Sequence, residues 1–339
     1  MRQHRLRAVV VAALVVVAAL VVPASATTNT SPYVRVCGTQ LCLHDATFPW
    51  QAASSLTGPG DPNGAAGMAV SAKLDVLRIV DFLDVAGATK TAPYDATRWA
   101  RVDGLIAAAT RAGLKVELDL STYRNLLVRH SINPYTYDWG PFVRWVAARK
   151  NTVTKQVYAN DPTIAMIAFA GEVEPPAGSN NTLKVTTAQV TSFFSRTLGQ
   201  WRAKDSHHLL TPGGLLQIDW NSGIDWHAIF SLPVVNVCAI HIYGLGDQTT
   251  TVPAVSSYCG GLNKPWITEE FGYAQADSDP VRAAEFTHIY DLQSTYGSAG
   301  AGFWNLGPQT TGTTYDVNTQ TPVTWSVVQS HAPVPTAVP

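Results

Sequence analysis

Apolar positions along the chain follow two alternating periods. Short apolar runs rich in β-branched residues, such as "LDVLRIVDF" (74–82), end in polar or aromatic residues. Between them lie longer stretches with apolar residues at helical spacing. In the stretch 95–113, Asp95 stands at the start and Gly113 just past the end, as in a capped helix. The pattern therefore predicts strands that alternate with helices.

About eight strands are expected when an early one at 48–54 is counted. The other strands are predicted at 74–82, 114–121, 163–170, 208–214, 234–243, 264–272 and 299–307. Helices are predicted at 95–113, 139–158, 187–205, 226–230, 253–259, 279–297 and 321–331. Alternation of this kind implies parallel strands, and eight of them favour an α/β fold of the (β/α)8 TIM-barrel type in one domain. No GxGxxG or GxxxxGK[ST] motif follows a strand, so no sequence motif supports an open nucleotide-binding sheet. No cofactor is expected.

The first 26 residues have the layout of a secretory signal peptide. The chain begins with basic residues, continues with an apolar run at 8–22 and then has the small residues Ala24, Ser25 and Ala26. The apolar run is shorter than the ~20 residues that span a bilayer, although an uncleaved anchor is the alternative. We therefore expect an exported, extracellular protein with its domain at 27–331 and no membrane association after cleavage.

Two smaller features flank the predicted barrel. Residues 33–48 alternate and turn at Gly38, which indicates an N-terminal β-hairpin, and the proline-rich end 332–339 is expected to be a disordered tail. The chain has four cysteines, an even number for an oxidising compartment. Three pairings are possible, and we expect the two local ones: Cys37–Cys42 and Cys238–Cys259. No CxxC or nearby histidine spacing favours zinc, so no metal is predicted.

Charge narrows the range of ligands. The formal net charge is −1 and charged residues make up 14% of the chain. No basic patch indicates nucleic acid, so a neutral or polar substrate fits better than a polyanion. The ten tryptophans and twelve tyrosines agree with sugar stacking or with ordinary core packing. We expect a monomer.

Pairs of glutamates follow two of the predicted strands. Glu172 and Glu174 come at the end of 163–170, and Glu269 and Glu270 end the strand at 264–272. The strand ends of a parallel barrel meet at one mouth, where two carboxylates are the minimum apparatus for glycoside hydrolysis. Helix capping or salt bridges are the alternative for each acid alone. Strand alternation predicts that only one of Glu269 and Glu270 faces the barrel interior.

Two segments of the chain match a known pattern: "YANDPTIAMIAFAGE" (158–172) and "KPWITEEFG" (264–272). They resemble the clan A glycoside hydrolases, most closely family five and its endo-β-1,4-mannanase branch. The resemblance implies a retaining enzyme that acts on a β-linked polysaccharide or oligosaccharide, mannan or glucan first. By the family's register, Glu172 is the proton donor and Glu270 is the nucleophile. A donor must stay protonated near neutral pH, which requires a less polar setting.

Further matches occur in order along the chain. The resemblance places Arg78 beside the nucleophile, His241 and Tyr243 at the end of the sixth strand, and Trp304 at the end of the eighth strand, on the floor of a sugar subsite. Other aromatic side chains are stacking candidates for which core packing is at least as good an interpretation: Tyr123, Trp220 and Trp266.

One position departs from the family. Gly171 stands where the family has an asparagine that hydrogen-bonds the sugar 2-OH, a contact that strengthens in the transition state. This departure favours the alternative hypothesis, a non-catalytic carbohydrate-binding or cell-wall-associated barrel, whereas Glu172 and Glu270 favour an enzyme. If the enzyme hypothesis holds, Glu172 and Glu270 should face each other while Glu174 and Glu269 point elsewhere.

Overall fold

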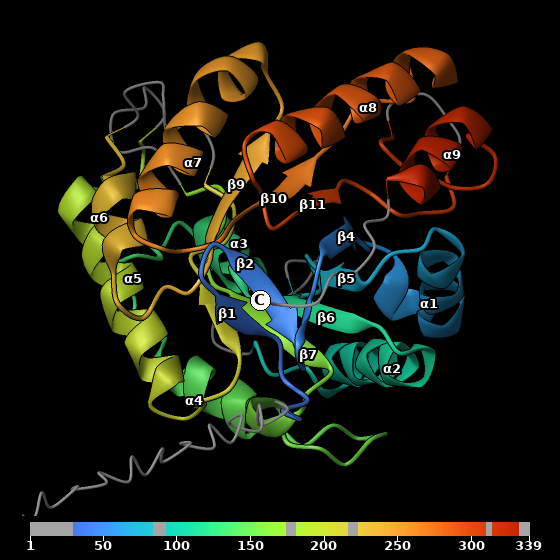
Figure 1. Cartoon of the computed structure of the whole chain (residues 1–339). Helices are drawn as coiled ribbons and strands as arrows, with labels where there is room; N and C mark the ends of the chain where they lie inside the picture. Colours follow the sequence, from blue (N-terminus) through green and yellow to red (C-terminus); the bar gives the residue numbers. More distant parts are fainter. Residues whose placement is uncertain (1–29, 84–92, 174–180, 216–222, 310–313, 332–339) are drawn as a thin grey trace, which may run out of the picture.

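The computed structural model describes residues 30–83, 93–173, 181–215, 223–309 and 314–331. The predicted signal peptide and the proline-rich tail therefore lie outside the described residues. Within these ranges the chain forms one barrel and a small accessory sheet (Figure 1).

All eight predicted strands form, and they pair side by side in parallel. The order in the sheet is β8-β7-β6-β5-β4-β11-β10-β9. An isolated parallel bridge between Leu215 and Ile240 joins the two ends of this order, which closes the barrel. The strands are β4 (Trp50–Ser54), β5 (Val76–Ile79), β6 (Lys115–Asp119), β7 (Ile164–Ala168), β8 (Leu209–Thr211), β9 (Cys238–Ile242), β10 (Trp266–Phe271) and β11 (Gly300–Phe303). The (β/α)8 fold expected from the sequence is confirmed.

Helices surround the barrel on the outside (Figure 1). They are α1 (Pro62–Ser71), α2 (Ala96–Ala112), α3 (Ser121–Arg129), α4 (Gly140–Ala148), α5 (Thr187–Arg202), α6 (Trp226–Ser231), α7 (Val252–Gly261), α8 (Asp279–Thr295) and α9 (Pro322–Ser330). Within the described residues, short turns of 3-10 or π-helix also occur at Gly58–Gly60, Tyr158–Asn160 and Asp247–Thr251. The side chain of Asp95 accepts a hydrogen bond from the Arg98 backbone N–H, and Gly113 ends α2 with a φ of 74°, as the sequence predicts.

A small antiparallel sheet covers one end of the barrel. It consists of β1 (Arg35–Cys37), β2 (Gln40–Leu43) and β3 (Ala46–Thr47), and Figure 1 shows β1 and β2 crossing in front of the barrel strands. Val34, Leu41 and Phe48 bury their side chains against residues at the starts of the barrel strands, among them Trp50 and Val76. The N-terminal end of the barrel is thereby covered, and the carboxyl ends of the strands are left for a site.

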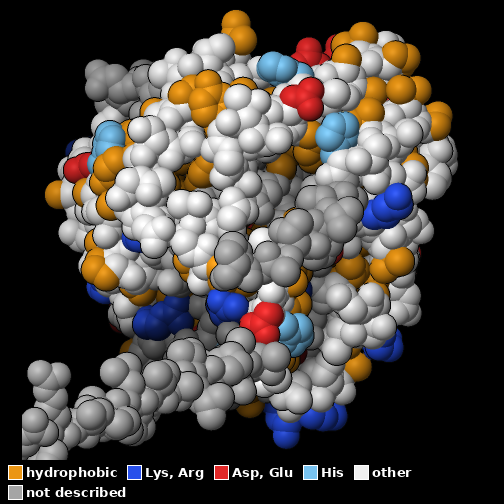
Figure 2. All heavy atoms as spheres, viewed as in Figure 1, with side chains coloured by type: hydrophobic (Ala, Val, Ile, Leu, Met, Phe, Trp, Pro, Cys, Tyr) orange, Lys and Arg blue, Asp and Glu red, His pale blue; other side chains and the backbone are white. Residues whose placement is uncertain are grey.

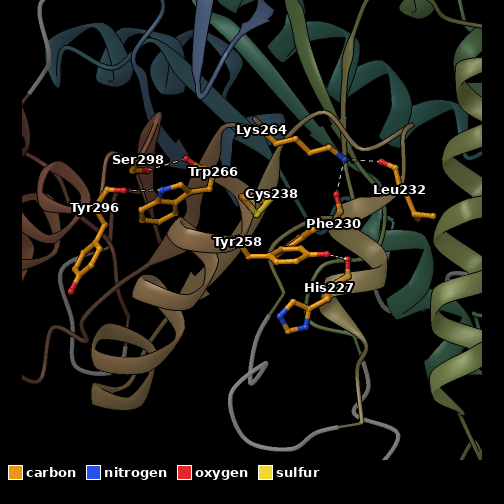
Figure 3. The surroundings of a disulfide bond; sticks show 10 residues. His227, Phe230, Leu232, Cys238, Tyr258, Lys264, Trp266, Tyr296 and Ser298 are labelled. Atoms are coloured by element: carbon orange, nitrogen blue, oxygen red, sulfur yellow. Dashed lines mark hydrogen bonds between the residues drawn. A yellow bond between two sulfur atoms is a disulfide. The ribbon is translucent and has the colours of Figure 1, made fainter. Parts of the chain in front are cut away.

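Both expected disulfides form. Cys37–Cys42 lies within the small sheet, and Cys238–Cys259 ties the start of β9 to α7. Figure 3 shows the second bond beside Trp266 and Lys264. The Lys264 ammonium donates to the carbonyl oxygens of Phe230 and Leu232, at 2.6 and 2.8 Å. This corner holds α6, α7 and the start of β10 together.

Basic side chains form no patch on the face seen in Figure 2. Lysine and arginine side chains are scattered along its rim and do not gather over the barrel. Across the described ranges, each helix is too short or too polar to pass through a lipid bilayer.

Candidate active site

Glu172 and Glu270 meet at the open end of the barrel. Glu172 follows β7, and Glu270 belongs to β10. His241 Nδ1 lies 2.9 Å from Glu172 Oε1 and 3.8 Å from Glu270 Oε1. A carboxylate oxygen of Glu172 lies within 4.8 Å of one of Glu270. The two side chains therefore face each other, as the family register requires, whereas Glu174 lies outside the described residues.

Arg78 lies at the base of this pair. It stands on β5, is 4% exposed, and places Nη1 2.5 Å from Glu270 Oε2. Its Nη2 lies 2.5 Å from Asp119 Oδ2 and 3.1 Å from Glu269 Oε2. A buried guanidinium with so many carboxylate partners stays charged, which holds the Glu270 carboxylate in place.

The expectation that only one of Glu269 and Glu270 faces the interior was wrong. Both carboxylates contact Arg78. The pairing of β10 with β9 shifts register between Thr268 and Glu270, so Glu269 is the extra residue of a β-bulge. A bulge breaks the strict alternation of a strand and lets neighbouring side chains share a side. Glu269 is buried below Glu270 and accepts from His241 Nε2 at 3.0 Å and from the Gly214 backbone N–H at 2.7 Å.

His241 and Tyr243 each contact a carboxylate of the pair. The His241 ring is buried, with Nδ1 toward Glu172 and Nε2 toward Glu269. The Tyr243 hydroxyl donates to Glu270 Oε1 at 2.5 Å. The structure thus brings together four of the predicted site residues around Arg78: Glu172, His241, Tyr243 and Glu270.

The charge state of Glu172 differs from the expectation for a proton donor. A hydrogen bond from His241, together with its charge, lowers the pKa of Glu172 to about 2 although burial opposes the shift. For His241, burial works against the charged ring, but Glu270 and then Glu172 and Glu269 raise its pKa to about 10. In the protein without substrate, the proton between His241 and Glu172 therefore lies on the histidine.

The backbone at Glu172 is held by a neighbouring arginine. Glu172 has a φ of 52°, in the left-handed region that a side chain rarely adopts. Arg124 of α3 donates through Nη1 to the carbonyl oxygens of both Gly171 and Glu172. Its Nη2 donates to Asn125 Oδ1 at 2.7 Å, and Asn125 in turn donates to Asp81. Sequence reasoning missed Arg124, because a contact to backbone carbonyls leaves no motif.

Close packing of glycines explains the departure at Gly171. A Cβ on Gly171 would meet the Gly214 backbone nitrogen at 3.1 Å, and a Cβ on Gly213 would meet the Gly171 nitrogen at 2.5 Å. The ends of β7 and β8 thus pack backbone to backbone beside the site. The region that a side chain at position 171 would enter first is filled by Gly213 and Gly214.

Gly214 is a position where one added methyl group should disable the site. A Cβ there would lie 1.9 Å from the His241 ring, so Gly214→Ala must displace the imidazole or the backbone. We expect a loss of ~1–3 kcal/mol in the free energy of unfolding, as for other overpacked cores, and loss of turnover. Urea denaturation and a hydrolysis assay measure both effects. Gly199→Ala, at a glycine of α5 with nothing within 4 Å of an added Cβ, is the matched control and should leave turnover unchanged.

The aromatic candidates separate into one pocket residue and two core residues. Trp304 follows β11 and lines a cavity of about 160 Å³ together with Glu172, Glu270 and Arg78. Tyr123 does not lie at this cavity: it is 3% exposed and packs against Phe142 and other rings. The core interpretation therefore holds for Tyr123, because α3 turns this ring toward α4.

Trp266 belongs to the core as well. It is 2% exposed and donates to the Tyr296 carbonyl oxygen at 3.1 Å (Figure 3). Trp220 lies outside the described residues, so its proposed stacking role stays a prediction.

Three of these side chains could also serve as metal ligands. Glu172, His241 and Glu270 each offer one ligand atom, and these atoms lie within 4.8 Å of one another. However, Arg78 already supplies a positive charge to Glu270, and His241 pairs with a carboxylate on each side. Hydrogen bonds and ion pairs alone account for the arrangement.

Comparison with known proteins identifies the fold. No family model and no curated protein matches the sequence. An endo-1,4-β-mannanase from Rhizomucor miehei superimposes with a TM-score of 0.74 at 19% identity, covering 88% of this chain and 98% of that one. A glycoside hydrolase family 5 mannosidase from the same organism gives 0.65 at 14%, covering 89% and 97%. The catalytic domain of the major endoglucanase from Xanthomonas campestris pv. campestris gives 0.56 at 13%, covering 90% and 99%.

These likenesses define the class of fold. The chain has the (β/α)8 barrel fold of these structures, and the fold agrees with the resemblance seen in the sequence. At identities of 13–19% the likeness speaks for the fold, and activity has to be argued from the site.

Proposed function

We propose that this protein is a retaining glycoside hydrolase that cleaves a β-linked polysaccharide, with mannan and glucan as the first candidates. The observation that carries the proposal is the pair of Glu172 and Glu270 carboxylates, with oxygens within 4.8 Å of each other at the open end of the barrel. Retaining enzymes hold the two carboxyl groups ~5–5.5 Å apart, and inverting enzymes ~6.5–9.5 Å apart. The short separation supports the retaining mechanism.

The surroundings of Glu270 suit a nucleophile. Its two oxygens receive the Tyr243 hydroxyl and the Arg78 guanidinium, both at 2.5 Å. These donors fix the carboxylate for attack on the anomeric carbon, and they stabilise it again when it leaves the glycosyl-enzyme intermediate. Glu172, 42% exposed on the other side of the cavity, would protonate the departing oxygen and then activate water for the second step.

The polar lining of the cavity suits a sugar. Besides Glu172 and Glu270 it offers the side chains of Asp81, Asn125 and Ser121, and Trp304 contributes an aromatic surface. Hydrogen-bonding groups around one aromatic ring are what a pyranose, with hydroxyls at its edge and C–H groups on its faces, requires.

The residue at position 171 bears on how the subsite distinguishes one sugar from another. Mannose and glucose differ in the configuration at C2, and the 2-OH is the group that the family's asparagine contacts. Gly171 offers no side chain to contact the 2-OH. Its close packing against Gly213 and Gly214 leaves little room for the asparagine that the family has at this position. We therefore propose that the subsite discriminates weakly between manno- and gluco-configured chains.

A second candidate is a non-catalytic carbohydrate-binding barrel. The lowered pKa of Glu172 and the glycine at position 171 are the observations that favour it. Both candidates bind a glycan in the same cavity, so binding alone does not separate them.

Reducing-sugar release from β-mannan, β-glucan and bacterial wall glycans separates the two candidates. The hydrolase proposal predicts release from at least one glycan by the wild-type protein and none by Glu270→Ala. Glycan retention without release, with equal retention by Glu270→Ala, would favour the binding protein.

We also infer that the protein acts outside the cell. Two disulfides in a chain of this size are typical of an oxidising compartment. A polysaccharide substrate agrees with that location. The predicted signal peptide would provide the route.

A further inference from the structure

A layer of buried acids lies directly beneath the two facing glutamates. Glu117 of β6 is 0% exposed and Glu269 is 1% exposed. Arg78 lies beside both acids, with Nε 4.0 Å from Glu117 Oε1 and Nη2 3.1 Å from Glu269 Oε2. Neither acid reaches the cavity, so neither can touch a substrate. The acids that fill this layer therefore need a role other than contact with the sugar.

The charges of this network do not balance if every acid is ionised. Five carboxyl groups surround two cationic side chains, Arg78 and His241. The carboxyl groups are Glu117, Asp119, Glu172, Glu269 and Glu270. Burial of an unpaired carboxylate is costly enough that such a group takes up a proton. At least one of the buried acids should therefore be neutral.

Hydrogen bonding indicates which acid is neutral. Glu269 Oε2 receives the Gly214 N–H at 2.7 Å, His241 Nε2 at 3.0 Å and Arg78 Nη2 at 3.1 Å, so every partner donates to it. Among the described residues, no donor reaches either oxygen of Glu117. Glu117 is also fully buried, whereas three donors reach Glu269 Oε2. A buried carboxyl group that receives no donor is the one that keeps its proton.

His241 has acceptors on both sides. A neutral imidazole has one N–H and one acceptor nitrogen, whereas both nitrogens here face carboxylate oxygens, at 2.9 and 3.0 Å. The pKa values of Glu172 and Glu269 are both lowered, so both groups are ionised and both nitrogens donate to them, which is the protonated form of the ring. The carboxylate below it is Glu269 and the one above it is Glu172.

We propose that the Glu269 carboxylate, with a neutral Glu117 beside it, keeps the proton of the reaction on His241 Nδ1. Glu172 takes this proton from His241 and passes it to the leaving oxygen. This inference rests on the proposed hydrolase function for its last step. Glu269 and Glu117 are then positioning residues that act through His241. The pKa shifts of the two acids agree with a neutral Glu117 beside an ionised Glu269. Burial and the Glu269 charge raise the pKa of Glu117, while Arg78 and His241, against burial, lower that of Glu269.

The proton balance closes over one catalytic cycle. His241 begins as imidazolium and Glu172 as carboxylate. As the glycosidic bond breaks, the Nδ1 proton passes across 2.9 Å to Glu172 and on to the leaving oxygen, which leaves His241 neutral. In the second step water attacks the anomeric carbon, its proton goes to Glu172 and returns to Nδ1, and the C–O bond to Glu270 breaks. No other reactant is needed.

The groups that face His241 set the pH at which the stored proton is lost. Glu172 approaches from the end of β7, and Glu269 and Glu270 approach from β10. Arg78 of β5 lines the same cavity. Tyr243, two residues further along the chain, contacts Glu270. Removing the charge of Glu269 takes away one of three carboxylates near the ring. The proton should then leave at lower pH.

The test compares Glu269→Gln with Glu117→Gln. Histidine nitrogens of 15N-labelled protein are titrated by NMR, and His241 is identified by the signal lost in His241→Asn. Since a neighbouring charge moves a titration by ~1–3 pH units, we expect Glu269→Gln to lower the His241 midpoint by that amount. Glu117→Gln replaces a neutral acid by a neutral amide and should leave the midpoint within a few tenths of a unit. The alkaline limb of kcat/KM should move in the same way.

Three results would overturn the proposal. His241 could be neutral at pH 7 in the wild-type protein, which decides the matter even if Glu269→Gln does not fold. Glu269→Gln could leave the midpoint where it was. Glu117→Gln could shift the midpoint as much as Glu269→Gln does, which would show that Glu117 is ionised. Because the NMR titration needs no turnover, a protein without hydrolase activity would refute the proposed function and still give a clear answer on the charge state.

Discussion

Replacing Glu270 by alanine is expected to abolish turnover of every glycoside. In the proposed mechanism the side chain provides the atom that bonds the anomeric carbon, and its oxygens are fixed by Arg78 and Tyr243 at 2.5 Å. Loss of a residue that acts covalently lowers kcat by ~10^4- to 10^6-fold. The loss should be equal for polysaccharides and for activated aryl glycosides, because both need the same nucleophile.

The control for this variant is another carboxylate on the same molecule. Asp291 is exposed on α8, and Asp291→Ala should keep the turnover of the wild-type protein. Thermal melting of Glu270→Ala distinguishes loss of chemistry from loss of fold. A folded Glu270→Ala protein that still hydrolyses an aryl glycoside would remove Glu270 from the nucleophile's role.

Replacing Glu172 by alanine should give a loss that depends on the leaving group. General acid catalysis contributes ~10^2- to 10^4-fold, so hydrolysis of a polysaccharide should fall by that factor. A dinitrophenyl glycoside needs no proton to leave, so its first step should keep the wild-type rate while the second step slows. Stopped-flow release of dinitrophenol then shows a burst followed by a slow phase.

The structure adds a reason to expect that the loss in Glu172→Ala depends on the leaving group. Glu172 is held against His241 at 2.9 Å and is ionised in the absence of substrate, so its part in the first step is proton transfer alone. Equal losses on natural and activated substrates would contradict the donor role. Glu172→Gln, which keeps the shape and removes the proton, should reproduce the pattern of Glu172→Ala.

The fold could be predicted from the sequence because each strand is apolar and each strand end is marked. All eight strands were expected, since short β-branched runs stand between helical stretches. The helix predicted at 139–158 was too long: α4 ends at Ala148. Beyond that point Asp103 of α2 accepts hydrogen bonds from Arg149 and Thr152, and these tertiary contacts overrule the local preference for a helix.

Two helices escaped the prediction for local reasons. Helix α1 contains two glycines within ten residues, and α3 spans nine residues directly after β6. Both are too short or too rich in glycine to give a clear helical period.

The part of the candidate site that lies at the strand ends could be predicted from the sequence, and the part that depends on strand pairing could not. Strand order places Arg78, Glu172, His241 and Glu270 at one mouth, and the structure brings them together there. The β-bulge at Glu269 could not be predicted, because it depends on the pairing of β10 with β9. Glu117 gave no signal either, since an acid in a strand looks like any half-exposed position until the barrel closes over it.

Trapping of the glycosyl-enzyme intermediate is the most direct test of the central claim. A 2-deoxy-2-fluoro glycoside with a dinitrophenyl leaving group, prepared in the manno and gluco configurations, should react once and accumulate as a covalent adduct. The account predicts that the mass of the protein rises by one fluorosugar and that the added mass maps to Glu270. A protein that hydrolyses the parent glycosides without forming an adduct, or that carries the sugar on Glu269 or Glu172, would contradict it.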